Sequence, residues 1–259
     1  MSSSARQVTR PATPATAANS AKPKLTILHL YARELNIYGD GGNILTLVQR
    51  LRWRGYDAQV VQAGIGARPD IAAADIIFGG GGQDRGQSAV GQDLQRHAGA
   101  LHAAAAAGVP ILTICGTYQL FGRSFTTAEG TEIPGIGLFK ARTVATPLRM
   151  IGNIVIDTPL GRLVGFENHS GRTILEAGQA ALGSVVQGYG NDSRGQQEGA
   201  VVGNTYGTYL HGPVLPKNPA LADHLILTAL QRRYGVGALE PLDDSLEHAA
   251  AAVAMKRPQ

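Results

Sequence analysis

The chain has 259 residues, one cysteine and a formal net charge of +4, and these figures exclude several classes of protein. One cysteine excludes a disulfide framework and a cysteine-based zinc cluster, and it favours a reducing compartment, so we expect a cytoplasmic protein. The positive excess lies wholly within residues 1–24, while residues 25–259 hold equal numbers of bases and acids, so nothing indicates nucleic-acid binding. The longest apolar run, 103–115, is interrupted by Gly and Pro and is shorter than the roughly 20 residues of a bilayer span, so we expect no membrane insertion.

The first half of the chain predicts a parallel sheet. Residues 1–24 are rich in Ser, Ala, Thr and Pro, which indicates a disordered tail, and no apolar stretch follows its basic residues as a secretory signal requires. Short apolar strands then alternate with helices. The predicted strands are 25–30, 58–63, 76–78 and 109–114, and the predicted helices are 43–54 and 88–107. This order is typical of parallel strands covered by helices.

After about residue 123 the pattern changes to short β-branched segments separated by turns, which favours antiparallel strands. These predicted strands are 136–145, 151–157, 162–167, 184–188 and 199–203, followed by helices at 218–234 and 240–255. We therefore predict an α/β fold: an open, mostly parallel sheet flanked by helices, with an antiparallel extension. We divide the chain into the tail at 1–24, one domain at 25–235 and a C-terminal helical extension at 236–259.

Several common motifs are absent from the sequence. There is no Gly-Lys dipeptide for a phosphate-binding loop, no G-x-G-x-x-G after a strand and no G-x-S-x-G. Any ATP chemistry would therefore belong to another chain. His97 and His102 are five residues apart on a predicted helix and face different sides, so we interpret them as packing or solvent-facing residues and predict no metal site.

Cys115 stands where a predicted buried strand ends and a helix begins, directly before Gly116. The carboxyl ends of parallel strands face the ligand crevice of such folds, and a helix N-terminus favours a thiolate. A buried core cysteine is the other interpretation of this residue. His211 also follows a short predicted strand and is suited to serve as a general base, although a structural histidine in a turn fits equally. The glycines at 79–82 could turn backbone N–H groups toward an oxyanion, or simply form a loop.

Taken together, these motifs resemble the class I glutamine amidotransferases, and within them the cobyric-acid-synthase type. The resemblance is carried by Cys-Gly-Thr-Tyr-Gln-Leu-Phe-Gly at 115–122 and Tyr-Leu-His-Gly at 209–212. The segments 35–43, 80–85 and 165–173 are similar to the glutaminase (GatD-type) subunits of lipid II isoglutaminyl synthases. We expect residues 167–173 to form a polar loop, which either only packs near the crevice or contacts the substrate or a partner.

The resemblance implies hydrolysis of L-glutamine through a γ-glutamyl thioester. Cys115 would attack the side-chain amide, and His211 would take the thiol proton and return it to the leaving ammonia. Backbone N–H groups near Gly81 and of Gly116 would hold the oxyanion.

For the substrate and the partner, the resemblance implies further assignments. Arg149, Gly81 and Gln119 would contact glutamine, with the guanidinium of Arg149 on its α-carboxylate. The ammonia would pass to a Mur-ligase-like synthetase subunit, forming a heterodimer that amidates D-glutamate of lipid II to D-isoglutamine for peptidoglycan. This chain would bind no cofactor, and ATP and Mg²⁺ would belong to the partner.

The sequence departs from the wider class beside the histidine. A glutamate normally follows two residues after it, and here that position is Pro213. An acid from this chain, with Asp40, Glu167 and Asp192 as candidates, or an acid from the partner would then orient His211. We favour the partner, because that arrangement couples hydrolysis to assembly of the complex and limits the loss of ammonia.

Thr113 and Thr117 stand where many relatives have glycine, which predicts tight access to the thiol. Two other functions are compatible with the sequence. One is amide transfer to a corrinoid or another cytoplasmic acid, and the other is a non-catalytic regulatory subunit that keeps the fold.

Overall fold

The computed structural model describes residues 23–82, 84–194 and 196–257. The disordered tail predicted at 1–24 lies outside the described residues except for Pro23 and Lys24, and Gln83 of the 80–85 motif also lies outside them. The division into a domain at 25–235 and an extension at 236–259 stays a prediction.

The predicted parallel sheet is present, in the order β11-β12-β4-β3-β1-β2. Among these described strands only β11 runs antiparallel to its neighbour. Their bounds are β1 Lys24–Leu30, β2 Asp57–Ala63, β3 Ile76–Gly79, β4 Ile111–Ile114, β11 Ala200–Val202 and β12 Thr205–Thr208. Every residue of β3, β4 and β12 is buried, as expected for central strands covered on both faces.

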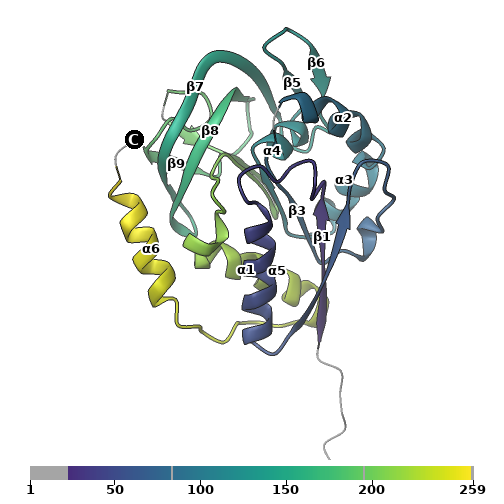
Figure 1. Ribbon diagram of the computed structural model, residues 1–259. Coiled ribbons are helices and arrows are strands. Elements are labelled where there is room, and N and C mark those ends of the chain that lie inside the picture. Colours follow the sequence, from purple (N-terminus) through teal and green to yellow (C-terminus); the bar gives the residue numbers. More distant parts are fainter. Residues whose placement is uncertain (1–22, 83, 195, 258–259) are drawn as a thin grey trace, which may run out of the picture.

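The helices lie on both sides of this sheet. Their bounds are α1 Gly41–Trp53, α2 Asp84–Gln95, α3 Ala98–Ala106, α4 Gly116–Phe121, α5 Pro219–Tyr234 and α6 Ser245–Met255, with 3-10 turns η1 at Ile71–Ala73 and η2 at Leu215–Lys217. Figure 1 shows α1 and α5 together on one side of β1 and β3 and α2, α3 and α4 on the other. None of these helices, within the part of the chain that the structure describes, is long and apolar enough to cross a membrane.

The antiparallel extension forms a second sheet, in the order β10-β9-β7-β5-β6 with β8 paired to β7. The bounds are β5 Ser124–Thr126, β6 Glu132–Pro134, β7 Ala141–Thr158, β8 Gly161–Leu175, β9 Gly183–Gln187 and β10 Gln197–Glu198. The long hairpin of β7 and β8 dominates it (Figure 1). The strands predicted at 136–145 and 151–157 are therefore one strand, whose register shifts between Ala145 and Met150.

The single helix predicted at 88–107 is wrong, because α2 and α3 are separate helices. The N–H groups of Arg96 and His97 bind the carbonyls three residues back, at Asp93 and Leu94, which ends α2. The carboxylate of Asp93 accepts hydrogen bonds from the Tyr31 hydroxyl and the Gly66 N–H, so the end of α2 is tied to neighbouring loops.

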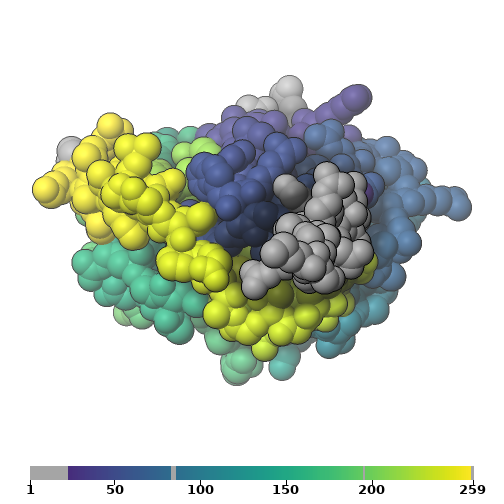
Figure 2. All heavy atoms as spheres, turned by 90° about the horizontal axis from the view of Figure 1, so that it is seen from below, coloured from purple at the N-terminus to yellow at the C-terminus, as the bar shows by residue number. Residues whose placement is uncertain are grey.

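A buried arginine joins α1 to the C-terminal part of the chain. Arg50 is 1% exposed, and its guanidinium donates two hydrogen bonds to each carboxylate of Asp223 on α5 and Asp244 at the start of α6, at 2.5–3.0 Å. Arg54 adds two further bonds to Asp223. Figure 2 shows the C-terminal segment, in yellow, running across the lower face and standing out at one edge of the molecule. The arginine therefore holds a helix that buries none of its own residues fully.

We expect Arg50→Met to lower the free energy of unfolding by about 3–5 kcal/mol, because it leaves the carboxylate of Asp244 without its charged partner. Urea unfolding followed by circular dichroism measures this loss. Arg52→Met is the control, since Arg52 lies exposed on the same helix. Equal losses in the two variants would contradict a clamping role for Arg50.

Candidate active site

Cys115 occupies a sharp turn between β4 and α4. Its backbone has φ +48° and ψ −104°, a strained conformation for a residue with a side chain, and its N–H donates to the Thr208 carbonyl at 2.8 Å. The residue is 5% exposed and lines a cavity of about 350 Å³. The turn therefore presents the only sulfhydryl of the chain to a space that admits a small molecule.

The structure assigns the hydroxyls of Thr113 and Thr117 to backbone contacts, and the tight access to Cys115 that we expected from them stays a prediction. The hydroxyl of Thr113 donates to the Tyr206 carbonyl at 3.1 Å, and that of Thr117 donates to the Gly80 carbonyl at 2.7 Å. Both side chains thus stabilise backbone beside the turn, and neither is among the described residues that line the cavity.

His211 meets Cys115 across Gly81. A Cβ atom placed on Gly81 would lie 2.7 Å from Cε1 of His211 and 3.3 Å from Cβ of Cys115. The backbone of His211 is held by an antiparallel bridge to Phe166 of β8, with hydrogen bonds in both directions. The two predicted catalytic residues therefore lie on either side of one glycine.

The imidazole of His211 is fully buried, and neither ring nitrogen has a hydrogen-bond partner. Burial, aided by the charge of nearby His169, lowers the pKa of His211 to about 3, so the ring is neutral and both of its nitrogens lack a stabilising contact. Among the described residues, no acid is therefore hydrogen-bonded to this ring.

The three acids that we considered as partners of His211 are engaged elsewhere. Asp40 accepts the Gly81 N–H at 3.1 Å, and Asp192 accepts the backbone N–H of Arg194. Glu167 accepts the N–H groups of residues 189 and 190 at 2.6 and 3.0 Å. None of the three reaches His211 in this structure.

The hydrogen bond between Gly81 and Asp40 also bears on the predicted oxyanion site, which stays a prediction. The Gly81 N–H points to a buried carboxylate, whose pKa is raised to about 6 by desolvation, and is not available to a substrate oxygen in this arrangement. Gly82 lines the cavity, and a Cβ on Gly116 would lie 3.3 Å from the Gly82 nitrogen. The backbone of Gly116 therefore lies next to Gly82, and Gly82 is a further candidate beside Gly81 and Gly116.

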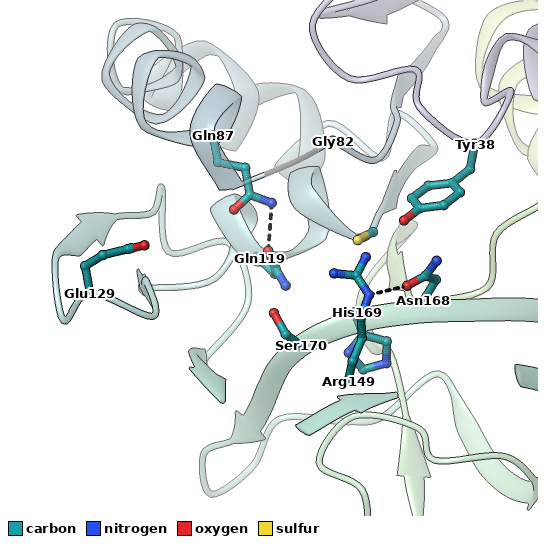
Figure 3. A pocket seen from close by; sticks show the side chains of 10 residues that line it. Tyr38, Gly82, Gln87, Gln119, Glu129, Arg149, Asn168, His169 and Ser170 are labelled. Atoms are coloured by element: carbon teal, nitrogen blue, oxygen red, sulfur yellow. Dashed lines mark hydrogen bonds between the residues drawn. The ribbon is translucent and has the colours of Figure 1, made fainter. Parts of the chain in front are cut away.

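The cavity brings together residues from strands β7 and β8 of the second sheet, from helices α2 and α4, and from loops. It is lined by Tyr38, Gly82, Gln87, Cys115, Gln119, Glu129, Arg149, Asn168, His169 and Ser170. Figure 3 shows Arg149 from β7 hydrogen-bonded through its Nε to Asn168, at 2.7 Å. Gln119 is fixed from both ends, since its oxygen accepts from Gln87 at 2.9 Å and its amide nitrogen donates to the Tyr209 hydroxyl at 3.1 Å. Arg149 and Gln119 thus face the cavity, and their roles in binding remain predictions.

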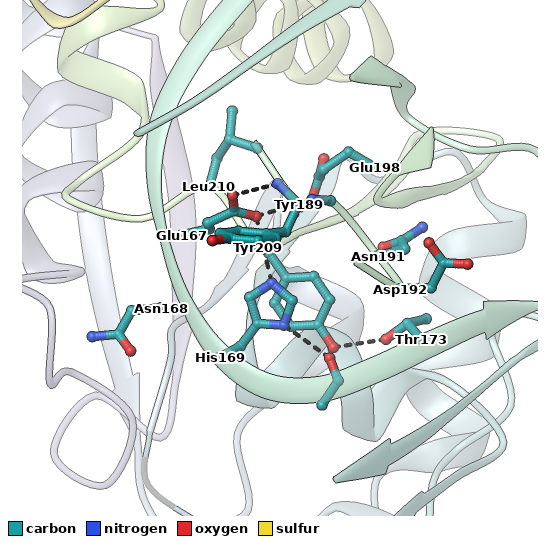
Figure 4. A network of polar contacts seen from close by, with 12 residues as sticks. Glu167, Asn168, His169, Thr173, Tyr189, Asn191, Asp192, Glu198, Tyr209 and Leu210 are labelled. Carbon is teal, nitrogen blue, oxygen red and sulfur yellow. Dashed lines mark hydrogen bonds and ion pairs between the residues drawn. The ribbon is translucent and has the colours of Figure 1, made fainter. Parts of the chain in front are cut away.

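The polar segment predicted as a loop at 167–173 is instead part of strand β8. Residues 167, 169, 171 and 173 are buried, and those between them are more exposed, which is the alternation of a strand. Figure 4 shows Glu167 and His169 on one side of the strand and Asn168 on the other. His169 stacks on Tyr209 with 3.6 Å between the ring centroids. Because Asn168, His169 and Ser170 all line the cavity, this strand forms one of its walls.

Glu198 is a fully buried acid that no sequence pattern singled out. Glu198 accepts the Tyr209 N–H at 2.6 Å and the Thr208 hydroxyl at 3.1 Å, and burial raises the pKa of its carboxyl to about 8. Tyr38, Gln87 and Glu129 were also missed as cavity residues. The turn signal at 36–42 was visible, but nothing in it indicated which side chain faces the cavity.

No group of three His, Cys, Asp or Glu residues within the described ranges could hold a metal ion.

Solved structures place the fold in a known class of protein. A crystal structure of a glutamine amidotransferase superposes with a TM-score of 0.53 at 13% identity, covering 78% of this chain and 98% of its own. The fold is therefore that of the glutamine amidotransferases.

The sequence comparisons define the family within that class. The family model of the CobB/CobQ-like glutamine amidotransferase domain matches residues 26–219, and the chain belongs to this family. The chain is 41% identical over 211 residues to the lipid II isoglutaminyl synthase (glutamine-hydrolyzing) subunit GatD of Staphylococcus aureus, covering 81% of this chain and 86% of that protein. It is 39% identical to the subunit of the same name from Streptococcus pneumoniae, over 82% and 83%. The cobyric acid synthase of Pelotomaculum thermopropionicum is 36% identical over 56% of this chain and 30% of that protein.

We expect Glu198→Gln to change how stability depends on pH. Between pH 4.5 and about 8 the folded protein keeps a proton on this carboxyl that the unfolded chain releases, so the free energy of unfolding falls as the pH rises. Glutamine keeps an acceptor for the Tyr209 N–H and does not titrate, so the variant gains stability relative to the wild type as the pH rises. Urea unfolding at pH 5, 6.5 and 8 measures the difference, with the exposed Glu240→Gln as control. Parallel curves for wild type and Glu198→Gln would contradict the assignment.

Proposed function

We propose that this chain is the glutamine-hydrolysing subunit of a lipid II isoglutaminyl synthase. The observation that carries the proposal is the meeting of Cys115 and His211 across Gly81, at a cavity that also holds Arg149. The substrate class rests on the two GatD relatives, which match this chain over nearly their whole length. The cobyric acid synthase match covers less than a third of that protein, so it favours the corrinoid alternative less.

In the first half of the proposed reaction, Sγ of Cys115 attacks the side-chain amide carbon of L-glutamine while His211 takes the thiol proton. The carbonyl oxygen becomes an oxyanion, held by the N–H groups of Gly82 and Gly116. When the intermediate collapses, the C–N bond breaks, His211 returns the proton to the leaving nitrogen, and ammonia departs from a γ-glutamyl thioester.

In the second half, His211 removes a proton from water, and the resulting hydroxide attacks the thioester carbon. The C–S bond breaks, the proton returns to the Cys115 thiolate, and glutamate leaves. Arg149 binds the α-carboxylate of the substrate, because a guanidinium presents two parallel donors to a carboxylate. Gln119, fixed from both ends, offers a rigid polar wall near the reacting amide.

The ammonia passes to a Mur-ligase-like partner subunit that holds ATP and Mg²⁺ and activates the α-carboxyl of D-glutamate in lipid II. We place this reaction in the cytoplasm, which suits a chain with a single cysteine. The product is the D-isoglutamine of the peptidoglycan precursor. No cofactor is assigned to this chain.

The partner also supplies the acid that orients His211. A groove of about 640 Å³ leads to the imidazole between α6 and β8, and we call it the α6 groove; Tyr38, Phe166, His211, Lys217, Leu246, Val253 and Arg257 are among its lining residues. Lys217 and Arg257 give it a positive charge that suits an arriving carboxylate. Such a carboxylate would raise the pKa of His211 from about 3 toward neutrality, where a general base works best.

We expect Cys115→Ala to lower glutamine hydrolysis by at least about a thousandfold, because the nucleophile is removed. Release of glutamate, measured enzymatically, gives the rate, and urea unfolding and co-purification show that fold and partner binding persist. Activity retained in the variant would remove Cys115 from the mechanism. Wild-type protein that hydrolyses no glutamine, alone or with its partner, would favour the non-catalytic regulatory subunit.

We expect the complex with the Mur-ligase-like subunit to amidate lipid II when ATP and glutamine are supplied, with mass spectrometry detecting the amide. The Cys115→Ala complex is the matched control, and ammonium chloride should restore its product because the synthetase step is intact. The isolated chain should hydrolyse glutamine more slowly than the complex, since it lacks the orienting acid. An isolated chain as active as the complex contradicts the partner acid, and amidation of a corrinoid acid in place of lipid II contradicts the substrate.

A further inference from the structure

The imidazole of His211 is oriented by the groups packed against it, since its ring nitrogens have no hydrogen-bond partner. Gly81 packs so closely that a Cβ there would lie 2.7 Å from Cε1. The phenol ring of Tyr38 also packs against the imidazole, with 4.4 Å between ring centroids and 52° between ring planes. Rotation of the imidazole would therefore require Tyr38 or Gly81 to move.

The loop that carries Tyr38 is fastened to the same glycine segment. The Ile37 N–H donates to the Gly81 carbonyl at 3.3 Å, and the Gly81 N–H donates to Asp40 at 3.1 Å. Within the loop, the Asn36 side chain accepts the Gly41 N–H at 2.9 Å. Gly39 adopts φ +74°, a value that favours glycine. Two hydrogen bonds thus join the loops that carry Tyr38 and Gly81, so both contacts of His211 are set together.

Tyr38 also separates two spaces. It lines both the cavity that contains Cys115 and the α6 groove that contains His211. Figure 3 shows its phenol directed into the cavity, toward the space that the guanidinium of Arg149 occupies. Tyr38 therefore contributes to the walls of both spaces, beside the imidazole.

We propose that Tyr38 is a positioning residue of the glutaminase reaction, whose aromatic ring fixes the orientation of the His211 imidazole and covers part of its surface. This inference rests on the proposed function and adds a residue to it. The role belongs to the ring and not to the hydroxyl, because the contact with the imidazole is between two rings. Phenylalanine should therefore serve in its place, and alanine should not.

The pH dependence of the reaction distinguishes this role from simple packing. The titratable and charged groups around His211 are His169 on β8, Lys217 and Arg257 in the α6 groove, Cys115 beyond β4, and Asp40 and Tyr38 on the loop before α1. Burial is the larger cause of the low pKa of His211, and the charge of His169 adds to it. Removing the ring exposes more of the imidazole to water, so its pKa rises toward its ordinary value and the acid limb of the rate profile moves to higher pH.

The experiment compares Tyr38→Ala, Tyr38→Phe and Ile37→Ala in the full chain, alone and with its partner, from pH 4 to 9. Ile37 is the matched control, because it precedes Tyr38 in the same loop and is 46% exposed. We expect Tyr38→Ala to lower kcat for L-glutamine near neutral pH by about 10- to 100-fold, with a smaller change in KM. Its acid limb should move up by about one pH unit or more, whereas Tyr38→Phe and Ile37→Ala stay within about twofold of wild type with an unmoved limb.

Three results would overturn the inference. A loss in Tyr38→Phe as large as in Tyr38→Ala assigns the effect to the hydroxyl. A rise in KM with kcat unchanged makes Tyr38 only a wall of the binding cavity, and a fall in kcat with an unmoved acid limb makes it a structural residue. Absence of glutamine hydrolysis in the wild-type complex is a different failure, because it removes the proposed function itself.

Discussion

The site depends on the absence of a side chain at Gly81. A Cβ at this position would meet the imidazole of His211 and approach the Cβ of Cys115. The three residues follow β3, β4 and β12, which are adjacent parallel strands in the order β12-β4-β3. Their carboxyl ends necessarily meet at one edge of the sheet, so the topology brings the segments together and the missing Cβ lets them touch.

The second sheet holds the backbone of His211 and supplies further residues of the cavity. β8 fixes the backbone of His211 through the bridge at Phe166 and presents Asn168 and His169 to the cavity. Its neighbour β7 supplies Arg149. The predicted antiparallel extension is thus a wall of the site. Residues along β8 alternate between a buried face, which carries Glu167 and His169, and a more exposed face, which carries Asn168.

The sequence predicted those features of the fold and the site that depend on residues close together in the chain. Apolar runs ended by glycine predicted the parallel strands, and a cysteine and a histidine at strand ends predicted the pair that meets at Gly81. The two segments of β7 were separated because the pattern breaks near Pro147, where the register of the pairing shifts. The break between α2 and α3 carries neither glycine nor proline. The direction of the Gly81 N–H and the burial of Glu198 depend on residues distant in the chain, so no local pattern contains them.

The burial of His211 without a hydrogen-bonded acid weakens its imidazole as a base, and the groups around it fix the ring by packing alone. Desolvation favours the neutral ring and lowers the pKa to about 3, which makes the imidazole a weak base on its own. The contacts with Tyr38 and Gly81 fix the ring without supplying charge. A carboxylate that enters the α6 groove would find the ring already oriented, with Lys217 and Arg257 among the groove's lining residues. In the proposed function, orientation and activation are thereby separated: this chain would provide the first, and a carboxylate of the partner would provide the second.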